Sequence, residues 1–288
     1  MRDWVERMPG GTAVDRITLP SGGHLRVYSH GAGPVVLFLH GFPERAISWQ
    51  GQFGALPGYR CVAPDLRGFG GSHRPRGRWH YTPRRLTAEL AELIAVLGGQ
   101  VDVVAHDWGA ALAWELAMDH PALVRRLCVL NGPPLPLMVR ALSRPSQLAR
   151  SWYFLVFQLP VLPEWRLAAD PERMMARTFR GAAGLPEVFD RAALAPFVEQ
   201  ARAGFGGVDY YRGALASFAR PPRPVRCPVR VLFGVEDPAL DVSVFADPAN
   251  YAGWVEQLEM VRIPDAGHWL QQEAPDRVNA ELREFLGC

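Results

Sequence analysis

Short continuous apolar runs, which are typical of strands buried on both faces of a sheet, recur along this chain. They occupy residues 34–41, 59–68, 100–107, 124–132, 228–237 and 258–268. An earlier segment, 17–31, has two strand-like runs on either side of an SGG turn, and this pattern predicts an antiparallel hairpin.

Patterns with helical spacing separate several of these runs. The clearest covers 81–99, where Thr82 stands at the N-cap position, Pro83 in the first turn and Gly98 at the C-terminal end. A similar pattern, APDRVNAELREFLG, lies close to the last residue. The alternation of strands and helices predicts an α/β fold, with a mostly parallel sheet, helices on both faces and the hairpin leading the sheet.

The interval 133–224 breaks this alternation. It begins with NGPPLP, ends near RPPRPVRCP, and between them reads as helices rich in aromatic residues, Met and Arg. Proline clusters at both ends predict a helical cap inserted into a core that is formed by 1–132 and 225–288. The longest apolar stretches are too short or too interrupted by proline to cross a bilayer, so we expect no membrane partner.

The composition of the 288 residues is that of a globular protein, with 49% hydrophobic and 21% charged residues. A net charge of +2 gives no reason to expect nucleic acid as a partner, and we interpret the basic segment HRPRGR, 73–78, as a solvated loop. All 31 basic residues are Arg, which excludes Schiff-base chemistry on lysine, pyridoxal phosphate enzymes and the P-loop lysine.

The four cysteines, Cys61, Cys128, Cys227 and Cys288, are far apart in the sequence and have no metal-ligand spacing. They are consistent with free thiols in a reducing compartment, and we expect neither a metal nor an organic cofactor. The first residues, MRDWVERMPGG, lack the apolar region of a signal peptide. We therefore expect a cytoplasmic protein.

The segment VVAHDWGAALAW, 103–114, begins like a strand, turns through small residues and ends like a helix. This is the pattern of a nucleophile elbow, in which the central side chain projects above the strand ends at a helix N-terminus. Here the central residue is Asp107. The same residue could instead be the N-cap of an ordinary strand-to-helix turn.

Partners for an Asp107 nucleophile occur later in the chain, in the order nucleophile, acid, histidine. His268 follows the last predicted strand, and Asp237 follows the strand that ends at Phe233, with Glu236 and Asp241 as rival acids. The other histidines have different expected roles: we expect His40 and His106 to hold loops by hydrogen bonding, and His24, His30, His73, His80 and His120 to be exposed.

Five motifs follow one another along the chain: HGFPE (40–44), DLRGFGGS (65–72), HDWGA (106–110), GVEDPAL (234–240) and DAGHW (265–269). In this order they resemble the motifs of the α/β-hydrolase superfamily and, more narrowly, of its epoxide hydrolases. The resemblance spans nearly the whole chain and implies the α/β-hydrolase fold, a mostly parallel eight-stranded sheet flanked by helices with an inserted helical cap. Haloalkane dehalogenases also have an aspartate at this position, often in the same HDWG.

A carboxylate nucleophile suits a saturated carbon that carries a leaving group. A serine would form an ether there, which water could not readily cleave, whereas Asp107 would form an ester. Water activated by His268, with Asp237 orienting the imidazole, can attack that ester and regenerate Asp107.

The resemblance also implies residues for the remaining roles. It assigns the oxyanion hole to the backbone N–H groups of Phe42 and Trp108, whose side chains would also line the substrate pocket. SWYFLVFQ (151–158) and GFGGVDYYRG (204–213) resemble the motifs that carry two proton-donating tyrosines, which map to Tyr153 and Tyr211. Tyr210 would point about 100° away from Tyr211 on a helix.

These residues predict an epoxide hydrolase that converts an uncharged hydrophobic epoxide to a vicinal diol, with water as the second substrate. A haloalkane dehalogenase is the first alternative: Trp108 could bind the halide with Trp152 or Trp165, although Phe42 stands where one dehalogenase group has asparagine. The second alternative is a ligand-binding protein without turnover. Asn131, where some relatives carry the acid, has no charge to offer, and both a monomer and a homodimer remain open.

Overall fold

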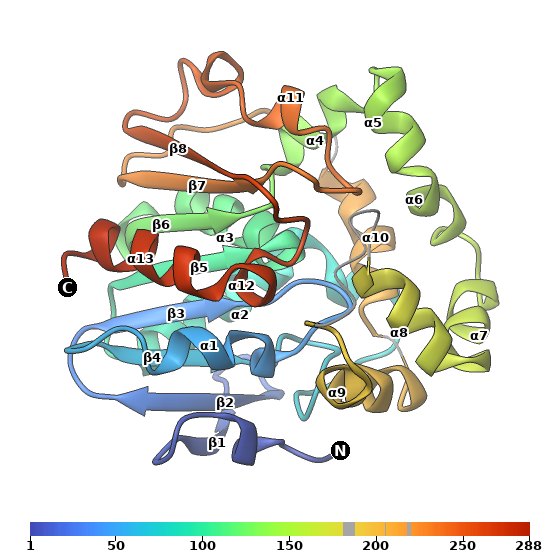
Figure 1. Ribbon diagram of the computed structural model, residues 1–288, viewed down its shortest axis with the longest axis horizontal. Coiled ribbons are helices and arrows are strands. Elements are labelled where there is room, and N and C mark those ends of the chain that lie inside the picture. Colours follow the sequence, from blue (N-terminus) through green and yellow to red (C-terminus); the bar gives the residue numbers. More distant parts are fainter. Residues whose placement is uncertain (181–187, 205, 218–219) are drawn as a thin grey trace.

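The computed structural model describes residues 1–180, 188–204, 206–217 and 220–288. Within these ranges the chain forms an eight-stranded sheet in the order β1-β2-β4-β3-β5-β6-β7-β8 (Figure 1). The strands are β1 (Ala13–Thr18), β2 (His24–Gly31), β3 (Val35–Leu39), β4 (Arg60–Pro64), β5 (Val101–His106), β6 (Val124–Leu130), β7 (Val229–Gly234) and β8 (Leu258–Ile263). Strands β1, β2 and β4 pair antiparallel, and all other neighbours are parallel. This confirms the predicted α/β-hydrolase fold.

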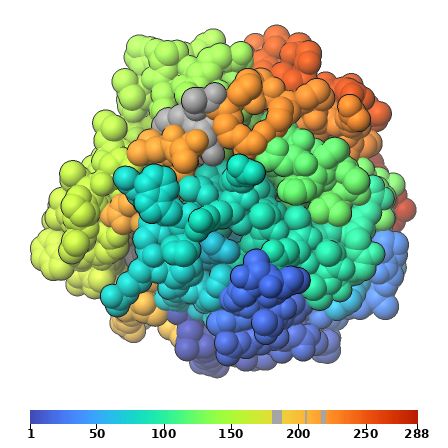
Figure 2. Space-filling view, turned by 180° about the vertical axis from the view of Figure 1, so that it is seen from behind, coloured from blue at the N-terminus to red at the C-terminus, as the bar shows by residue number. Residues whose placement is uncertain are grey.

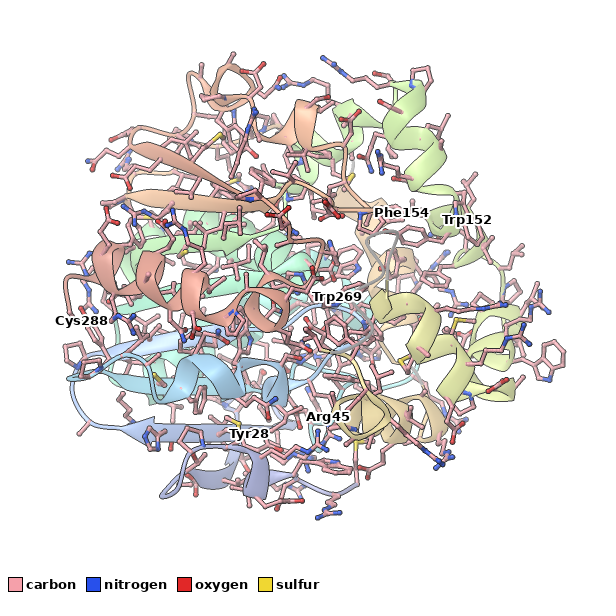
Figure 3. The ribbon with its side chains drawn as sticks, in the orientation of Figure 1. Tyr28, Arg45, Trp152, Phe154, Trp269 and Cys288 are labelled. Carbon is pink, nitrogen blue, oxygen red and sulfur yellow. The ribbon has the colours of Figure 1, made fainter. Side chains whose placement is uncertain are left out.

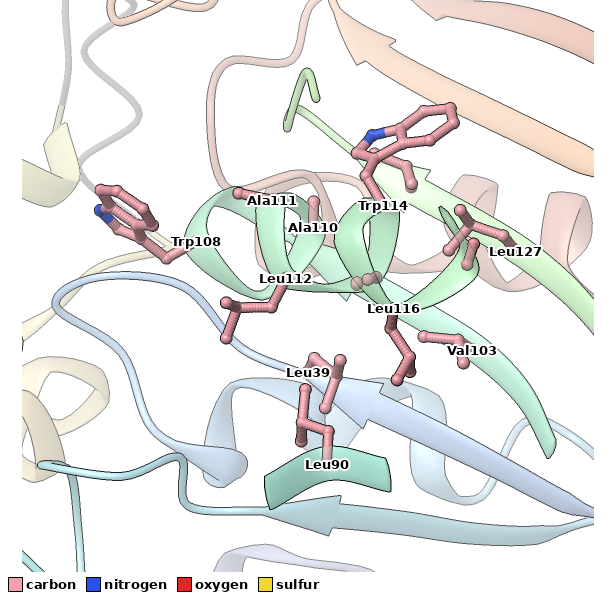
Figure 4. Packing of buried hydrophobic residues seen from close by; sticks show 14 of the residues in the cluster. Leu39, Leu90, Val103, Trp108, Ala110, Ala111, Leu112, Trp114, Leu116 and Leu127 are labelled. Atoms are coloured by element: carbon pink, nitrogen blue, oxygen red, sulfur yellow. The ribbon is translucent and has the colours of Figure 1, made fainter. Parts of the chain in front are cut away.

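Helices cover both faces of the sheet (Figure 1). Those of the core are α1 (Gln50–Phe53), α2 (Pro83–Val96), α3 (Asp107–Asp119), α11 (Val242–Phe245), α12 (Leu270–Glu273) and α13 (Pro275–Leu286). Successive residues of a strand point to opposite faces, so Leu37 and Leu39 of β3 pack with α2 and α3, whereas Val36 and Phe38 pack in the second cluster, on the side of α1 and α13. Figure 4 shows Leu39 and Val103 of the sheet beneath Leu112 and Leu116 of α3, with Leu90 of α2 beside them.

A group of helices between β6 and β7 lies beside the carboxyl ends of the parallel strands (Figure 1). They are α4 (Leu135–Ala141), α5 (Pro145–Arg150), α6 (Trp152–Val156), α7 (Leu162–Ala169), α8 (Pro171–Arg180), α9 (Arg191–Arg202) and α10 (Val208–Ala214). We refer to α4–α10 as the cap. Its division from the core at residues 133 and 224 stays a prediction. In the described part of the chain no helix has the length and apolar character needed to cross a membrane.

Three details of the sequence-based predictions differ from the structure. The first hairpin strand begins at Ala13 rather than at residue 17. Thr82 stands at the N-cap of α2, but its side chain makes no capping hydrogen bond. The five histidines expected to be exposed are half-buried; His73 Nε2, for example, lies 2.6 Å from a carboxylate oxygen of Glu89.

Candidate active site

Asp107 occupies a strained turn between β5 and α3. Its φ is +49°, a left-handed conformation that residues other than glycine rarely adopt. Three neighbouring glycines permit the turn. A Cβ on Gly109 would lie 2.3 Å from the Leu39 carbonyl oxygen, one on Gly41 would lie 2.5 Å from the Asp107 Cβ, and one on Gly132 would lie 2.2 Å from the Ala110 Cβ. Glycine in the turn and in the two neighbouring loops is therefore a steric requirement for presenting this carboxylate.

The two carboxylate oxygens of Asp107 have different surroundings. The backbone N–H of Phe42 donates a hydrogen bond of 2.7 Å to Oδ1, and Oδ2 lies 3.7 Å from Nε2 of His268. Trp108 is the second residue of α3, so its backbone N–H is among those that have no partner within the helix. Oδ1 is thus fixed, while Oδ2 faces the histidine.

Asp237 holds the other side of the His268 ring. Its Oδ2 lies 2.7 Å from Nδ1 of His268. Its Oδ1 accepts hydrogen bonds of 2.7 and 2.9 Å from the N–H groups of Ala239 and Leu240. The rival acids are elsewhere: the Glu236 side chain is exposed, and that of Asp241 accepts from the Ser243 N–H as the N-cap of α11. The structure thus brings Asp107, His268 and Asp237 together in that order.

The charges of this group shift the pKa values of its members. Burial alone would lower the pKa of His268, but the carboxylates of Asp237 and Asp107 raise it well above its usual value. Burial would raise the pKa of Asp107, but His268, the charge of His106 and the Phe42 N–H together lower it. Both shifts favour the ion pair between the Asp107 carboxylate and the protonated His268 ring.

The loop that carries His268 is anchored by residues to which we assigned no catalytic role. The Nε2–H of His106 donates to the His268 carbonyl oxygen at 2.9 Å, and Nδ1 of the same ring lies 2.7 Å from Oε2 of Glu44. Asn131 donates to the Gly267 and His268 carbonyls at 2.6 and 3.0 Å. Glu273 accepts from the Trp269 N–H at 3.0 Å. Glu44 belongs to the quoted HGFPE motif, and the hydrogen bonds of His106 confirm the prediction that this histidine holds a loop.

A pocket with an empty volume of about 850 Å³, its open mouth included, lies over Asp107 and His268. Its walls are mostly apolar and come from α3, α4, α6, α10 and the loop after β7. The lining includes Trp108, Ala111, Leu135, Met138, Leu142, Tyr153, Phe154, Leu155, Tyr211, Leu215 and Leu240. Apolar walls around a small number of polar groups are typical of sites for small molecules.

Tyr153 and Tyr211 both line this pocket, and their ring centroids lie 5.9 Å apart. Burial, together with the negative charge of Asp107, raises the pKa of both phenols, so both hydroxyls stay protonated at neutral pH. The neighbouring Tyr210 is turned away, and its hydroxyl donates a 2.9 Å hydrogen bond to the Arg67 carbonyl oxygen. Tyr211, and not Tyr210, therefore lines the pocket that contains Asp107.

The other predicted pocket residues have different positions. Trp108 lines the pocket, with its ring 4.9 Å from that of Tyr211. The Phe42 ring packs behind Tyr211 at 5.5 Å and is not part of the lining as far as the described residues define it. Trp152 and Trp165 are 63% and 61% exposed on the outside of the cap. Neither cap tryptophan stands where it could bind a halide next to Trp108.

Comparisons with known proteins agree with this geometry. The alpha/beta hydrolase family matches residues 36–281, and the chain belongs to it. Epoxide hydrolase 3 of Xenopus tropicalis is 37% identical over 263 residues, which cover 88% of this chain and 71% of that protein. Epoxide hydrolase A of Mycobacterium tuberculosis is 34% identical over 320 residues, covering 96% and 98%. The crystal structure of epoxide hydrolase A from Mycobacterium thermoresistibile superposes with a TM-score of 0.83 at 31% identity, covering 96% and 98%. Within the larger family, the chain belongs to the epoxide hydrolases.

Proposed function

We propose that this protein hydrolyses an uncharged, hydrophobic epoxide to a vicinal diol through an ester on Asp107. The observation that carries the proposal is that two protonated phenols, Tyr153 and Tyr211, share one apolar pocket with Asp107 and His268. Water is the second substrate, and the chemistry needs no metal or organic cofactor. The names of the relatives described above support the same reaction.

In the first step, Oδ2 of Asp107 attacks one carbon of the epoxide ring. The bond from that carbon to the epoxide oxygen breaks, and the oxygen takes its electron pair and a proton from Tyr153 or Tyr211. The Phe42 N–H keeps Oδ1 in place, so Oδ2 is the oxygen that is free to attack. The raised pKa of each phenol keeps its proton available until an alkoxide develops.

Formation of the ester changes the electrostatics of the site. Asp107 loses its negative charge, which had raised the pKa values of His268 and of both tyrosines. His268 then releases its proton more readily, and the phenolate takes it. The ester is left beside a neutral imidazole that Asp237 holds in orientation at 2.7 Å.

In the second step, His268 takes a proton from water, and the hydroxide attacks Cγ of Asp107. The negative charge that develops on Oδ1 is stabilised by the N–H groups of Phe42 and Trp108, the proposed oxyanion hole. The bond from Cγ to the ester oxygen then breaks. The diol leaves with the second proton of the water, and the site returns to the Asp107 anion and the His268 cation.

A haloalkane dehalogenase would use the same aspartate but needs donors for a halide ion. Trp108 is at hand, but the cap tryptophans are exposed and Phe42 offers a backbone N–H that already binds Asp107. The two tyrosines suit an alkoxide better, because they give it a proton.

The test is a panel of epoxides and haloalkanes in which diol and halide are measured together. We expect diol from the epoxides; halide without diol would contradict the proposal, and bound substrate without either product would indicate a binding protein.

Replacing Tyr153 or Tyr211 by Phe should slow ester formation by about ten- to a hundredfold, because each variant removes one of two proton donors. Tyr210→Phe is the matched control. It removes the hydrogen bond to the Arg67 carbonyl, which costs about 1 kcal/mol of stability, and it should leave the rate nearly unchanged. Single-turnover fluorescence or quenched-flow measurement of the ester gives the rates. Equal losses in the Tyr210 and Tyr211 variants would contradict the assignment.

Asp107→Asn should lower the pKa of His268 towards its usual value, because one of the two carboxylates that raise it is lost. The ring resonances of His268 in an NMR titration report this pKa directly. A folded-state pKa above the unfolded value near 6.5 means that the ion pairs stabilise the fold below that pH, and that this stabilisation disappears as the pH rises through the folded-state pKa. As the pH rises from about 6.5 through the folded-state pKa, the wild type should therefore lose more stability than the variant. An unchanged His268 pKa in the variant would contradict the electrostatic coupling between Asp107 and His268.

A further inference from the structure

The outer side of the cap exposes an unusual number of large apolar side chains. Seven residues are between 44% and 74% exposed, and we call them the outer cap face: Leu148, Trp152, Leu155, Leu159, Val161, Leu162 and Trp165. Leu148 lies on α5, Trp152 and Leu155 lie on α6 three residues apart, which places these two on the same side of that helix, and Leu159 follows it. Figure 3 shows Trp152 at the outer edge of the molecule and Phe154 pointing toward its interior.

Apart from Leu155, these outward residues are not part of the pocket lining. The inward side of α6 and the turn after it supply Tyr153, Phe154 and Phe157, whose rings lie 5.9, 5.0 and 4.8 Å from that of Tyr211. Helix α6 is therefore apolar on both its inner and its outer side. A helix with this character is normally buried on all sides, and large exposed apolar patches mark surfaces that contact something else.

Basic residues outnumber acids next to the outer cap face. Residues 144–166 contain three arginines and one acid, Glu164, and two further acids, Asp170 and Glu172, follow after α7. The Glu164 carboxylate is paired with Arg212 at 2.5 Å, and that of Glu172 with Arg202. Arg76 and Arg78, both exposed, line one surface depression with Pro160, Val161, Glu164, Asp209 and Arg212. The Asp209 carboxylate is also paired with Arg212, at 3.1 Å. Figure 2 shows the loop around residues 73–78, in cyan, beside the yellow-green cap segment.

The outer cap face is continuous with the mouth of the pocket. Leu155 is 70% exposed and belongs both to this face and to the pocket lining. Leu215, which is 46% exposed, also lines the pocket. The entrance to the active site therefore opens onto an apolar surface and not onto a polar one.

We propose that the outer cap face docks on the surface of an anionic lipid bilayer. Trp and Leu side chains next to arginines are the composition of surfaces that lie in the boundary between headgroups and acyl chains, and arginines near such a surface are attracted to anionic headgroups. A two-fold dimer through this face would instead bring two sets of arginines together, so the charges favour lipid over a second copy. The proposal departs from our expectation that the protein has no membrane partner, which rested on the lack of a spanning segment.

The docking goes beyond the proposed function and does not depend on it. If the substrate is a hydrophobic epoxide, it will partition into lipid, and the docked enzyme would take it up through an entrance that faces the bilayer. Vesicle binding can be measured without any substrate. A failure of docking and a failure of the hydrolase assignment are therefore separate results.

The test is co-sedimentation with vesicles of phosphatidylcholine alone and of phosphatidylcholine mixed with phosphatidylglycerol. We expect wild-type protein to bind the mixed vesicles and to be released by raised salt. Removing both basic residues, Arg76→Gln with Arg78→Gln, should weaken binding by about thirtyfold, about fivefold for each charge. The double variant Trp152→Gln with Trp165→Gln should weaken it by about tenfold or more.

Two matched controls use other faces of the molecule. Arg16→Gln with Arg277→Gln makes the same change in net charge at exposed positions on β1 and α13. Val96→Thr alters an exposed apolar residue at the end of α2, before the amino end of β5. Both controls should bind like the wild type. Failure of the wild type to bind the mixed vesicles, or equal losses in the control variants, overturns the proposal. A solution dimer that the tryptophan variant converts to a monomer in sedimentation velocity also overturns it.

Discussion

Asp107→Asn should abolish turnover, with kcat reduced by roughly a millionfold, the size of loss that follows removal of the nucleophile from a catalytic triad. The amide cannot attack a saturated carbon, but it can still accept the Phe42 N–H hydrogen bond that Oδ1 accepts in the wild type. Asn also tolerates the positive φ of this position better than most residues. The variant should therefore fold normally and bind substrate. An assay of diol formation checks the loss of turnover, and thermal unfolding checks that the variant folds normally.

The control for this variant is Asp241→Asn, which makes the same chemical change at the N-cap of α11. It should change stability only slightly, because Asn caps a helix about as well as Asp does, and it should leave turnover intact. The intact mass of the Asp107 variant must be followed during the assay, because deamidation would restore the aspartate. Full activity in a protein that still carries the amide would exclude Asp107 as the nucleophile.

His268→Gln should accumulate the ester on Asp107. Ring opening needs the carboxylate and the tyrosines, whereas hydrolysis of the ester needs a base, and loss of a positioned base slows such a step by roughly a hundred- to ten-thousandfold. The intact mass of the protein should rise by the mass of one epoxide after mixing with substrate. Peptide mapping should place the added mass on the peptide that contains Asp107.

His120→Gln is a suitable control, since this half-buried histidine lies at the end of α3, outside the pocket lining. It should show full turnover and no stable added mass. A His268 variant that stays unmodified after prolonged exposure to an epoxide that the wild type hydrolyses would contradict the assignment of His268 to ester hydrolysis.

The sequence predicted the architecture because its main signals are local. Continuous apolar runs marked the buried strands. β5, for example, lies between β3 and β6 in a sheet whose two faces are covered by helices, and it is buried at every position. The start of β1 was missed because its local signal is weak. This strand lies at the edge of the sheet, and its residues are exposed except for the half-buried Val14 and Ile17, so the sequence carries no regular strand pattern.

Roles within the site were predictable as far as chain order and motif could decide them. His268 follows the last strand, and the structure brings it to Asp107 and Asp237 as the spacing implied. The choice of Tyr211 over Tyr210 rested on motif alignment. Burial does not separate the two residues, because both side chains are nearly fully buried. What separates them is contact with other segments: Tyr210 reaches the Arg67 carbonyl, 143 residues away in sequence.

The loop-holding role of His106 was predicted, but the partners in the supporting network could not be read from the sequence. Glu44 and His106 are 62 residues apart, and no local pattern shows that they meet, or that His106 then reaches the carbonyl of His268. The half-burial of His73 depends in the same way on Glu89, 16 residues further along the chain. The exposure of Trp152 and Trp165 is also a tertiary property, since aromatic residues at helical spacing more commonly indicate a core.

One measurement tests the central idea, that Asp107 is alkylated and then released by water, most directly. Excess enzyme reacts with an epoxide for a single turnover in water enriched in oxygen-18, and both products are analysed by mass spectrometry. Attack of water on Cγ predicts the label in the carboxylate of Asp107 and an unlabelled diol. Label in the diol, with Asp107 unlabelled, would mean that water opens the ring directly and would contradict the covalent mechanism.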